Sequence, residues 1–214
     1  MFRVLLLFIA MNACATERPQ VLKQFMDNNE TTDYVTVVKN LTTEEKAFFW
    51  KNTKIDEDGI LLRTNPLDKD LTSTERMFGN SKKTVDKSSK VFKHIAKTFD
   101  IATIVGEFRE SEYHRNYFIK TPTGMAKLTI LDLAAEDYKV TVIAGFLNTK
   151  IRDSKASLIL LHGDKSSSKR IWVLSWHKNN IQYDFEIPDE IQPNGKTKLT
   201  KDDVINFATK ITNP

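Results

Sequence analysis

The sequence predicts an α+β fold in which N-terminal helices pack on a curved antiparallel meander of about seven strands, followed by a C-terminal helix. Two observations predict this fold. Between residues 101 and 187, apolar and polar residues alternate with period two, in runs that short turn sequences separate, which is typical of consecutive strands. On either side of that region, apolar residues recur every three or four positions, which is typical of helices. We therefore expect one sheet, with helices before and after it.

Residues 1–15 indicate an export signal. An apolar run of about eight residues follows the single basic residue Arg3, whereas a membrane-spanning helix needs about twenty. A general signal peptidase would cut after Ala15, and a bacterial lipoprotein peptidase would cut before an acylated Cys14. Cys14 is the only cysteine, so no disulfide can form within the chain, and this favours lipidation of Cys14. We expect an exported protein, either a membrane-anchored lipoprotein of a bacterial envelope or a secreted extracellular protein.

The remainder of the chain is predicted to be a tether followed by one domain. Residues 16–40 lack helical periodicity and include a polar cluster, 27–33, which is typical of a loop. Residues 41–214 are predicted to form a single α+β domain, because 40% hydrophobic and 28% charged residues are near the averages of globular proteins. The formal net charge of +4 is too small to indicate a nucleic-acid partner.

The first predicted helix begins after Thr42. Thr42 and Glu45 match a capping box, in which the two side chains satisfy amide groups of the first turn. The helix is expected to run to about residue 51, and a short strand is predicted at residues 60–63. The Asn65-Pro66 pair then interrupts the chain.

A longer helical pattern covers residues 73–99, and its second half, 83–99, has two different faces. The apolar face is predicted to pack on the sheet and comprises Val85, Phe92, Ile95, Ala96 and Phe99. The opposite face is basic and comprises Lys83, Lys87, Lys90, His94 and Lys97. Such a face is either a solvated surface or a contact for anionic lipid headgroups or an acidic partner. The four lysines are therefore candidate membrane-contact residues.

Seven strands are predicted in the middle of the chain, at residues 101–108, 113–120, 127–133, 138–146, 157–162, 169–176 and 181–186. The connections between them are short. Because a parallel crossover needs a dozen or more residues, we expect consecutive strands to be antiparallel neighbours. The sequence thus predicts a continuous meander.

The strand at residues 169–176 is apolar on both faces. Trp172 and Trp176 share one face, and Ile171 and Val173 share the other. Either the strand is central and covered on both sides, or one face lines a cavity in which the tryptophans contact a ligand. On the second interpretation, the candidate ligand-binding residues are Phe146, Trp172 and Trp176. The last predicted helix follows Thr200, with acidic residues in its first turn and Lys210 in its last.

No motif specific enough to name a reaction is present, so no catalytic residue, metal ligand or cofactor is assigned. The four histidines lie in different predicted elements, at His94, His114, His162 and His177. A metal site would require His162, Asp164 and His177 to meet, if their strands pair. Acid–base chemistry would instead use the carboxylates clustered around one turn, which are Asp132, Glu136 and Asp137.

A helix cradled in a curved sheet is similar to cystatin-like and NTF2-like proteins, and a partly closed calycin-like barrel is the alternative fold. Calycin barrels usually begin with a strand that carries a Gly-x-Trp signature, and this sequence has no such signature before its strands. We expect a non-catalytic binding module for an apolar or amphiphilic small molecule or for a protein partner. The alternatives are a secreted effector or inhibitor that acts by protein–protein contact, and an envelope or extracellular hydrolase.

Overall fold

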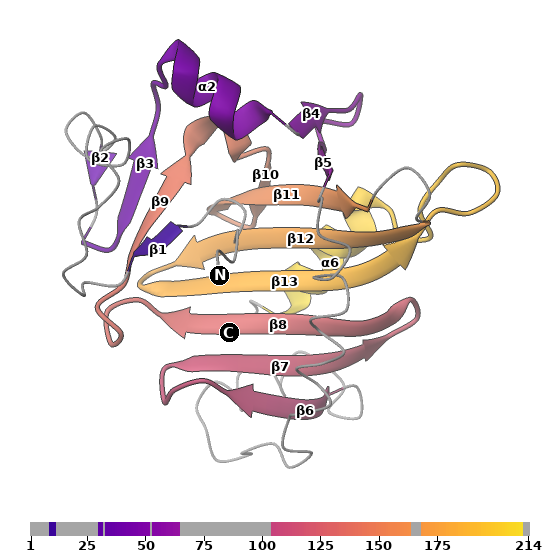
Figure 1. Ribbon diagram of the computed structural model, residues 1–214. Coiled ribbons are helices and arrows are strands. Elements are labelled where there is room, and N and C mark those ends of the chain that lie inside the picture. The colour runs from indigo at the N-terminus through magenta and orange to yellow at the C-terminus, as the bar shows by residue number, and fades with distance from the viewer. Residues whose placement is uncertain are drawn as a thin grey trace.

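The computed structural model describes residues 9–11, 30–31, 33–51, 53–64, 104–163 and 168–211. These residues form a large central sheet, a small second sheet and two α-helices (Figure 1). The central sheet consists of β4 (Thr53–Ile55), β5 (Leu61–Thr64), β6 (Ile104–Arg109), β7 (His114–Thr121), β8 (Gly124–Asp132), β10 (Thr149–Ile151), β11 (Ser154–His162), β12 (Lys169–Lys178) and β13 (Ile181–Glu190). The second sheet consists of β1 (Ile9–Met11), β2 (Glu30–Thr31), β3 (Val35–Val38) and β9 (Lys139–Ile143).

Each of the seven predicted stretches contains a strand, but the prediction of one continuous meander is wrong. The central sheet has the order β4-β5-β11-β12-β13-β8-β7-β6, with β10 beside β11. Strand β9 leaves this sheet and pairs with β1 and β3, so β13 takes the place beside β8. Leaving the central sheet lets β9 bury Val140 and Val142 against one side of it. Where the chain departs from β8, the Leu133 amide donates to the Asn180 carbonyl in the β12–β13 turn at 2.8 Å.

The central sheet is open and mixed. Among the described strands, its two outermost members are β4 and β6, which do not pair with each other, so these strands do not close into the calycin-like barrel of the alternative prediction. Strands β5 and β11 run parallel, as do β3 and β9, whereas the other neighbours are antiparallel. The coarse α+β prediction is therefore confirmed, with more strand than helix in the described chain.

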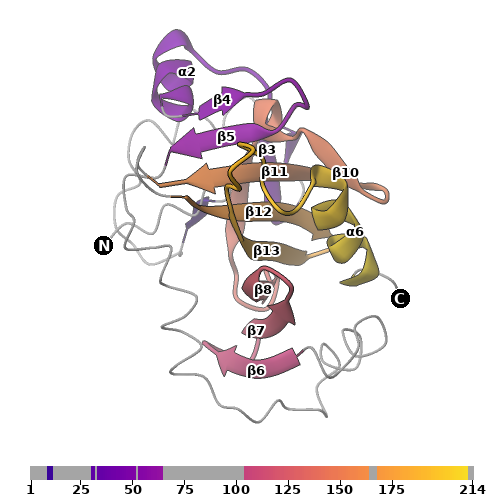
Figure 2. The same ribbon diagram turned by 90° about the vertical axis from the view of Figure 1, so that its right-hand side faces the viewer.

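The helices at the two ends form where the sequence predicts them. Helix α2 (Thr43–Trp50) begins with the capping box, in which Thr42 Oγ1 accepts from the Glu45 amide at 3.3 Å and Glu45 Oε2 accepts from the Thr42 amide at 2.7 Å. Helix α6 (Lys201–Ile211) begins with a similar reciprocal pair between Thr200 and Asp203. Its Val204 is fully buried against one side of the central sheet, where Figure 2 shows α6 lying.

Two hydrophobic cores lie on opposite sides of the central sheet. The first contains Trp172 and Trp176 and is covered by α6. The second contains β9 and the β11 residue Ile159, and α2 packs against it. Strand β12 contributes to both cores, because Ile171 and Val173 pack against the second one. Its two apolar faces are thus explained by a central position in the sheet with cover on both sides.

The fourth predicted strand is shorter than expected. It ends at Ile143, and residues Ala144–Phe146 form a turn of 3-10 helix instead of continuing the strand. This turn moves Phe146 off the strand and brings its ring to 4.7 Å from the ring of Trp50, between centroids. Contact with α2 therefore overrides the period-two pattern at this point.

Several predictions fall outside the described residues. The predicted helix at 73–99, with its candidate contacts Lys83, Lys87, Lys90 and Lys97, lies there, as do Cys14, His94, Asp164 and most of the tether. Within the predicted export segment, Ile9–Met11 forms β1 on the edge of β9. In the part of the chain that the structure describes, no helix has the length and apolar character needed to cross a membrane.

Candidate functional site

The two tryptophans predicted to contact a ligand are buried under α6. Trp172 is 2% exposed and Trp176 is fully buried. The Trp172 indole donates to Asp189 Oδ2 at 2.9 Å, and Trp176 stacks on Tyr183 with nearly parallel rings whose centroids are 5.0 Å apart. Their side chains therefore build the core on this side of the sheet.

Phe146, the third predicted ligand contact, is not brought together with them. Phe146 belongs to the second core and packs on Trp50, whereas Trp172 and Trp176 belong to the first. The central sheet separates the two groups. Ligand binding at these residues stays a prediction, but one pocket cannot be lined by all three in this fold.

The carboxylates that suggested acid–base chemistry are used to build a turn. Asp132 Oδ1 accepts from the amides of Ala134 and Ala135, each at 3.1 Å. Glu136 Oε1 accepts from the Ser111 hydroxyl, and Asp137 is exposed with a left-handed φ of 51°. These contacts fix the β8–β9 connection, as short polar side chains commonly do in turns.

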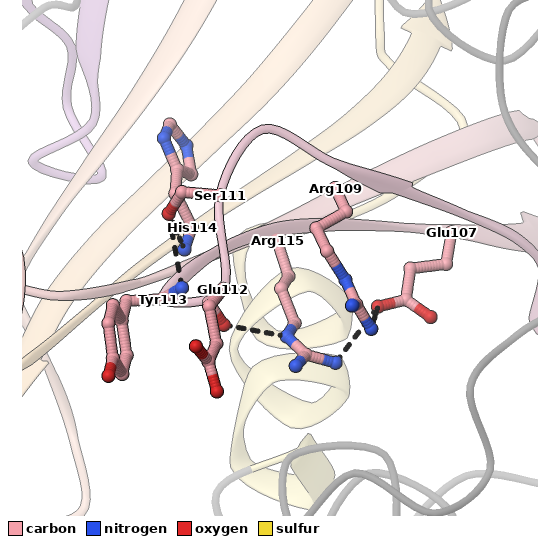
Figure 3. Close-up of polar contacts among 7 residues, drawn as sticks. All are labelled: Glu107, Arg109, Ser111, Glu112, Tyr113, His114 and Arg115. Atoms are coloured by element: carbon pink, nitrogen blue, oxygen red, sulfur yellow. Dashed lines mark hydrogen bonds and ion pairs between the residues drawn. The ribbon is translucent and has the colours of Figure 1, made fainter.

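The neighbouring β6–β7 hairpin has a hydroxyl, a histidine and carboxylates close together (Figure 3). Ser111 Oγ accepts from the backbone amides of Tyr113 and His114, at 3.1 and 3.0 Å, and the His114 ring faces Glu110, with Nδ1 3.4 Å from Oε2. Nucleophilic catalysis would require the ring to contact the hydroxyl. The polar contacts of this hairpin instead fix its turn.

The opposite side of the same hairpin carries an ion pair. Arg115 Nη1 lies 3.1 Å from Glu107 Oε1, and Arg109 Nη2 lies 4.0 Å from the same oxygen (Figure 3). Arg115 Nε also donates to the Glu112 carbonyl at 3.1 Å. Because Glu107 is buried, the two guanidinium groups compensate a carboxylate that would otherwise be costly to bury.

His162 and His177 do not meet, as the hypothetical metal site would require. His162 pairs with Arg170 across β11 and β12, so it lies seven positions along β12 from His177. At about 3.3 Å per residue, that separation is far beyond the reach of one metal ion. Across the described ranges, no three side chains of the metal-binding types come together. Burial lowers the pKa of His177 to about 4.

A row of polar side chains crosses the sheet on the face opposite the tryptophans. One member comes from each of five neighbouring strands, in the order Ser157, Ser175, Asp184, Thr129 and Asn116. The Ser175 hydroxyl donates to Asp184 Oδ1 at 2.5 Å, and Gln182 Nε2 donates to Asp184 Oδ2 at 2.6 Å. Burial raises the pKa of Asp184 to about 6, because it disfavours the charged carboxylate.

This row is not predicted from the sequence, because its members meet only through strand pairing. The available signal was the polar alternation of Ser175 with His177 and of Gln182 with Asp184. Asp184 is only 5% exposed and both its oxygens accept hydrogen bonds, so the carboxyl group is engaged within the protein. A buried polar network of this kind specifies strand register more readily than it contacts a substrate.

Apolar side chains are exposed where α2 meets β4. Phe48 is 72% exposed and Ile55 is 58% exposed. The exposed charged residues on α2, β4 and their connection are Glu44, Lys46, Lys51 and Lys54. We call Phe48, Ile55 and these four charged residues the α2–β4 corner. Two large exposed apolar side chains on neighbouring elements make this corner a candidate interaction surface.

The helix that carries Phe48 is packed on the second core. Trp50 packs on Phe146, and a Cβ atom added to Gly145 would lie 3.4 Å from the Trp50 ring, so α2 approaches the chain closely here. The rings of Phe48 and Phe49 are nearly perpendicular, and their centroids are 5.3 Å apart.

No family model, curated protein or solved structure matches the chain.

Proposed function

We propose that this protein is an exported, non-catalytic binding module that acts by protein–protein contact through the α2–β4 corner. The observation that carries this function is the 72% exposure of Phe48 on a helix whose other aromatic residues are packed. A large aromatic side chain held outward by a fixed helix needs little ordering when a partner binds. Such residues commonly supply most of the binding free energy at interfaces.

The edge of the central sheet suggests how the partner binds. Strand β4 is outermost in the strand order and, among the described strands, pairs with β5 alone. An extended partner segment would add to its other edge by main-chain hydrogen bonds. The apolar side chains of that segment would contact Phe48 and Ile55, and an acidic residue would be favoured near Lys54.

Export, acylation at Cys14 and packing of the helix 83–99 on the sheet belong to the same function, and we propose them from the sequence patterns. An acyl anchor would hold the module at a membrane surface. The basic face formed by Lys83, Lys87, Lys90 and Lys97 would then add electrostatic attraction to anionic lipids.

A small-molecule carrier is the second candidate function, and one observation favours it. The indole N–H of the fully buried Trp176 has no hydrogen-bond acceptor among the residues that the structure describes. A buried donor without a partner costs roughly 1–3 kcal/mol, so an amphiphilic guest with an acceptor group would be stabilised beside it. Such a guest would have to enter beneath α6.

Site-specific photo-crosslinking in the native host tests the protein-contact function. A photoreactive phenylalanine analogue replaces Phe48 in one chain and Tyr113 in a control chain, since Tyr113 is 45% exposed on the β6–β7 hairpin. We expect one defined protein adduct from position 48 that position 113 does not give. Identical adducts from both positions, or none from position 48, would refute contact through this corner.

A further inference from the structure

The chain turns back on itself between β13 and α6, at residues 191–197. The Gln192 amide donates to the Lys196 carbonyl, and the Gly195 amide donates to the Gln192 carbonyl, each at 2.8 Å. Asn194 and Gly195 lie at the tip of this turn, where both are exposed. They form the only Asn-Gly pair in the sequence. The turn shares no residue with the α2–β4 corner and is independent of the proposed protein contact.

An asparagine that precedes a glycine can react with its own main chain. After the Gly195 amide nitrogen loses its proton to hydroxide, it attacks Cγ of Asn194. A bond forms between that nitrogen and Cγ, the bond from Cγ to Nδ2 breaks, and Nδ2 takes up a proton from water and leaves as ammonia. Water then opens the resulting cyclic succinimide at one of its two carbonyl groups, which gives aspartate or isoaspartate. Because glycine has no side chain, nothing hinders the approach of its nitrogen to Cγ.

The folded turn restrains both reacting groups. The proton that Gly195 must lose is held in the hydrogen bond to the Gln192 carbonyl. A deprotonated nitrogen at this position would face the partly negative Gln192 oxygen at 2.8 Å, which disfavours loss of the proton. Asn194 Oδ1 accepts from the Lys196 amide at 2.9 Å, so the carboxamide is fixed as well. Attack on Cγ therefore requires the turn to open.

We infer that Asn194 is a deamidation site that the folded turn protects and that opening of the turn makes reactive. The turn is exposed and short, so it opens more often than the buried strands of the central sheet. When a reaction proceeds only from an open form that closes quickly, its rate is the rate in the open form multiplied by the fraction of molecules that are open. The extent of reaction at Asn194 thus records how often this turn opens.

The reaction also affects the attachment of α6. Isoaspartate carries the main chain through its side-chain carbon, which adds a methylene group to the backbone and changes the spacing of the hydrogen bonds in the turn. The turn leads to Lys198 and Leu199, whose amides donate to Asp189 at 3.1 and 3.0 Å, and then to α6. We expect the isoaspartate form to unfold at a lower guanidinium chloride concentration than the parent protein. An unchanged midpoint would contradict this coupling.

Peptide mapping of the full chain by mass spectrometry, after incubation at pH 8, tests the protection. One sample stays folded in buffer, and the other is unfolded in guanidinium chloride. Conversion of Asn194 is followed by the mass gain that accompanies replacement of an amide by an acid. We expect conversion in the folded sample to be slower by roughly tenfold or more. Equal rates in the two samples, or no conversion in the unfolded sample, would overturn the inference.

Asn179 is the control within the same chain. It is exposed in the β12–β13 turn, but the residue that follows it is Asn180. Because the Asn180 side chain hinders attack, conversion of Asn179 in the unfolded sample should be slower than that of Asn194. Asn180→Gly removes this hindrance and should bring the two rates together in guanidinium chloride. Rates that stay different in this variant would contradict the role assigned to glycine.

Pro193 provides a variant in which the turn opens more often. The proline ring fixes φ at the first central position of the turn, which favours the folded form. Pro193→Gly removes this restriction and keeps the Asn-Gly pair. We expect conversion of Asn194 to be faster by about threefold or more in the folded variant, and unchanged in guanidinium chloride. With folding verified by circular dichroism, an unchanged rate in the folded variant would contradict control by the turn.

Discussion

Ser175 donates its hydroxyl proton to Asp184 across β12 and β13 at 2.5 Å, and both side chains are buried. Gln182 holds the second carboxyl oxygen through Nε2, while its own Oε1 has no hydrogen-bond partner among the described residues. When Asp184 is ionised, the network therefore contains one more hydrogen-bond acceptor than its donors satisfy. A protonated Asp184, or an asparagine in its place, would donate to Gln182 once the Gln182 amide rotates.

Asp184→Asn should stabilise the protein at neutral pH. Burial raises the pKa of Asp184 to about 6, whereas the unfolded chain has the ordinary value of 3.8. Between these values the folded state holds more protons than the unfolded state, so the contribution of Asp184 to stability falls as pH rises and stays low above pH 6. Ionisation of the buried Asp184 lowers the free energy of unfolding of the wild type by on the order of 3 kcal/mol. In urea unfolding at pH 8, Asp184→Asn should therefore have a higher free energy of unfolding than the wild type. Equal stabilities at pH 8 would contradict this.

His177 should produce the opposite pH dependence. Burial lowers its pKa to about 4 in the folded state, below its ordinary value of 6.5. Between these values the unfolded state holds more protons, so stability is lost as pH falls. The two effects offset each other between about pH 4 and 6 in the wild type. We expect urea unfolding across this window to show stability rising with pH in Asp184→Asn and falling with pH in His177→Gln. Parallel profiles in the two variants would rule out this account.

Two phenylalanines should respond very differently to substitution. Phe146 is 2% exposed in the second core, so Phe146→Ala should lower the free energy of unfolding by about 3–5 kcal/mol. Phe48 is largely exposed, so Phe48→Ser should change it by no more than about 0.5 kcal/mol. Chemical denaturation measures both values. A large loss of stability in Phe48→Ser would mean that this side chain is needed for folding and not reserved for a partner.

The capping box predicts a smaller effect at the start of α2. Thr42→Ala removes the hydroxyl that accepts from the Glu45 amide, and it should cost about 1 kcal/mol of stability. Thr43→Ala is the matched control, because Thr43 is the exposed first residue of the helix. The difference between the two variants in urea unfolding measures the cap, and no difference would exclude a stabilising role for it.

Local sequence patterns predicted most strands of the central sheet and the two helices that the structure describes, but not the three-residue strands β4 and β10. Period-two alternation located the strands in the middle of the chain, and Thr42 with Glu45 located α2. Strand order depends on which strand edges pair with each other. The alternation of apolar and polar residues does not report this, because it is the same whether a strand stays in the sheet or leaves it. The strand predicted at residues 138–146 therefore forms, as β9 at Lys139–Ile143, but beside a different neighbour from the one predicted.

The candidate sites were harder to predict, because exposure and register are nonlocal. Phe48 and Phe49 are adjacent in an aromatic run, and only the packing of α2 decides which one is exposed. Likewise, two tryptophans on one face of β12 are compatible with a packed core and with the wall of a cavity, so the sequence pattern does not distinguish the two. Asp184 meets Ser175 only when β12 and β13 pair in one particular register.

Crosslinking yield at position 48 in chains with an altered β4 tests contact through the α2–β4 corner most directly. Ile55 is 58% exposed, so its substitution leaves the core unchanged. Ile55→Val keeps the apolar surface and should preserve the adduct, whereas Ile55→Glu places a charge in the contact and should abolish it. An adduct of the same yield in the Ile55→Glu chain would contradict the proposed contact.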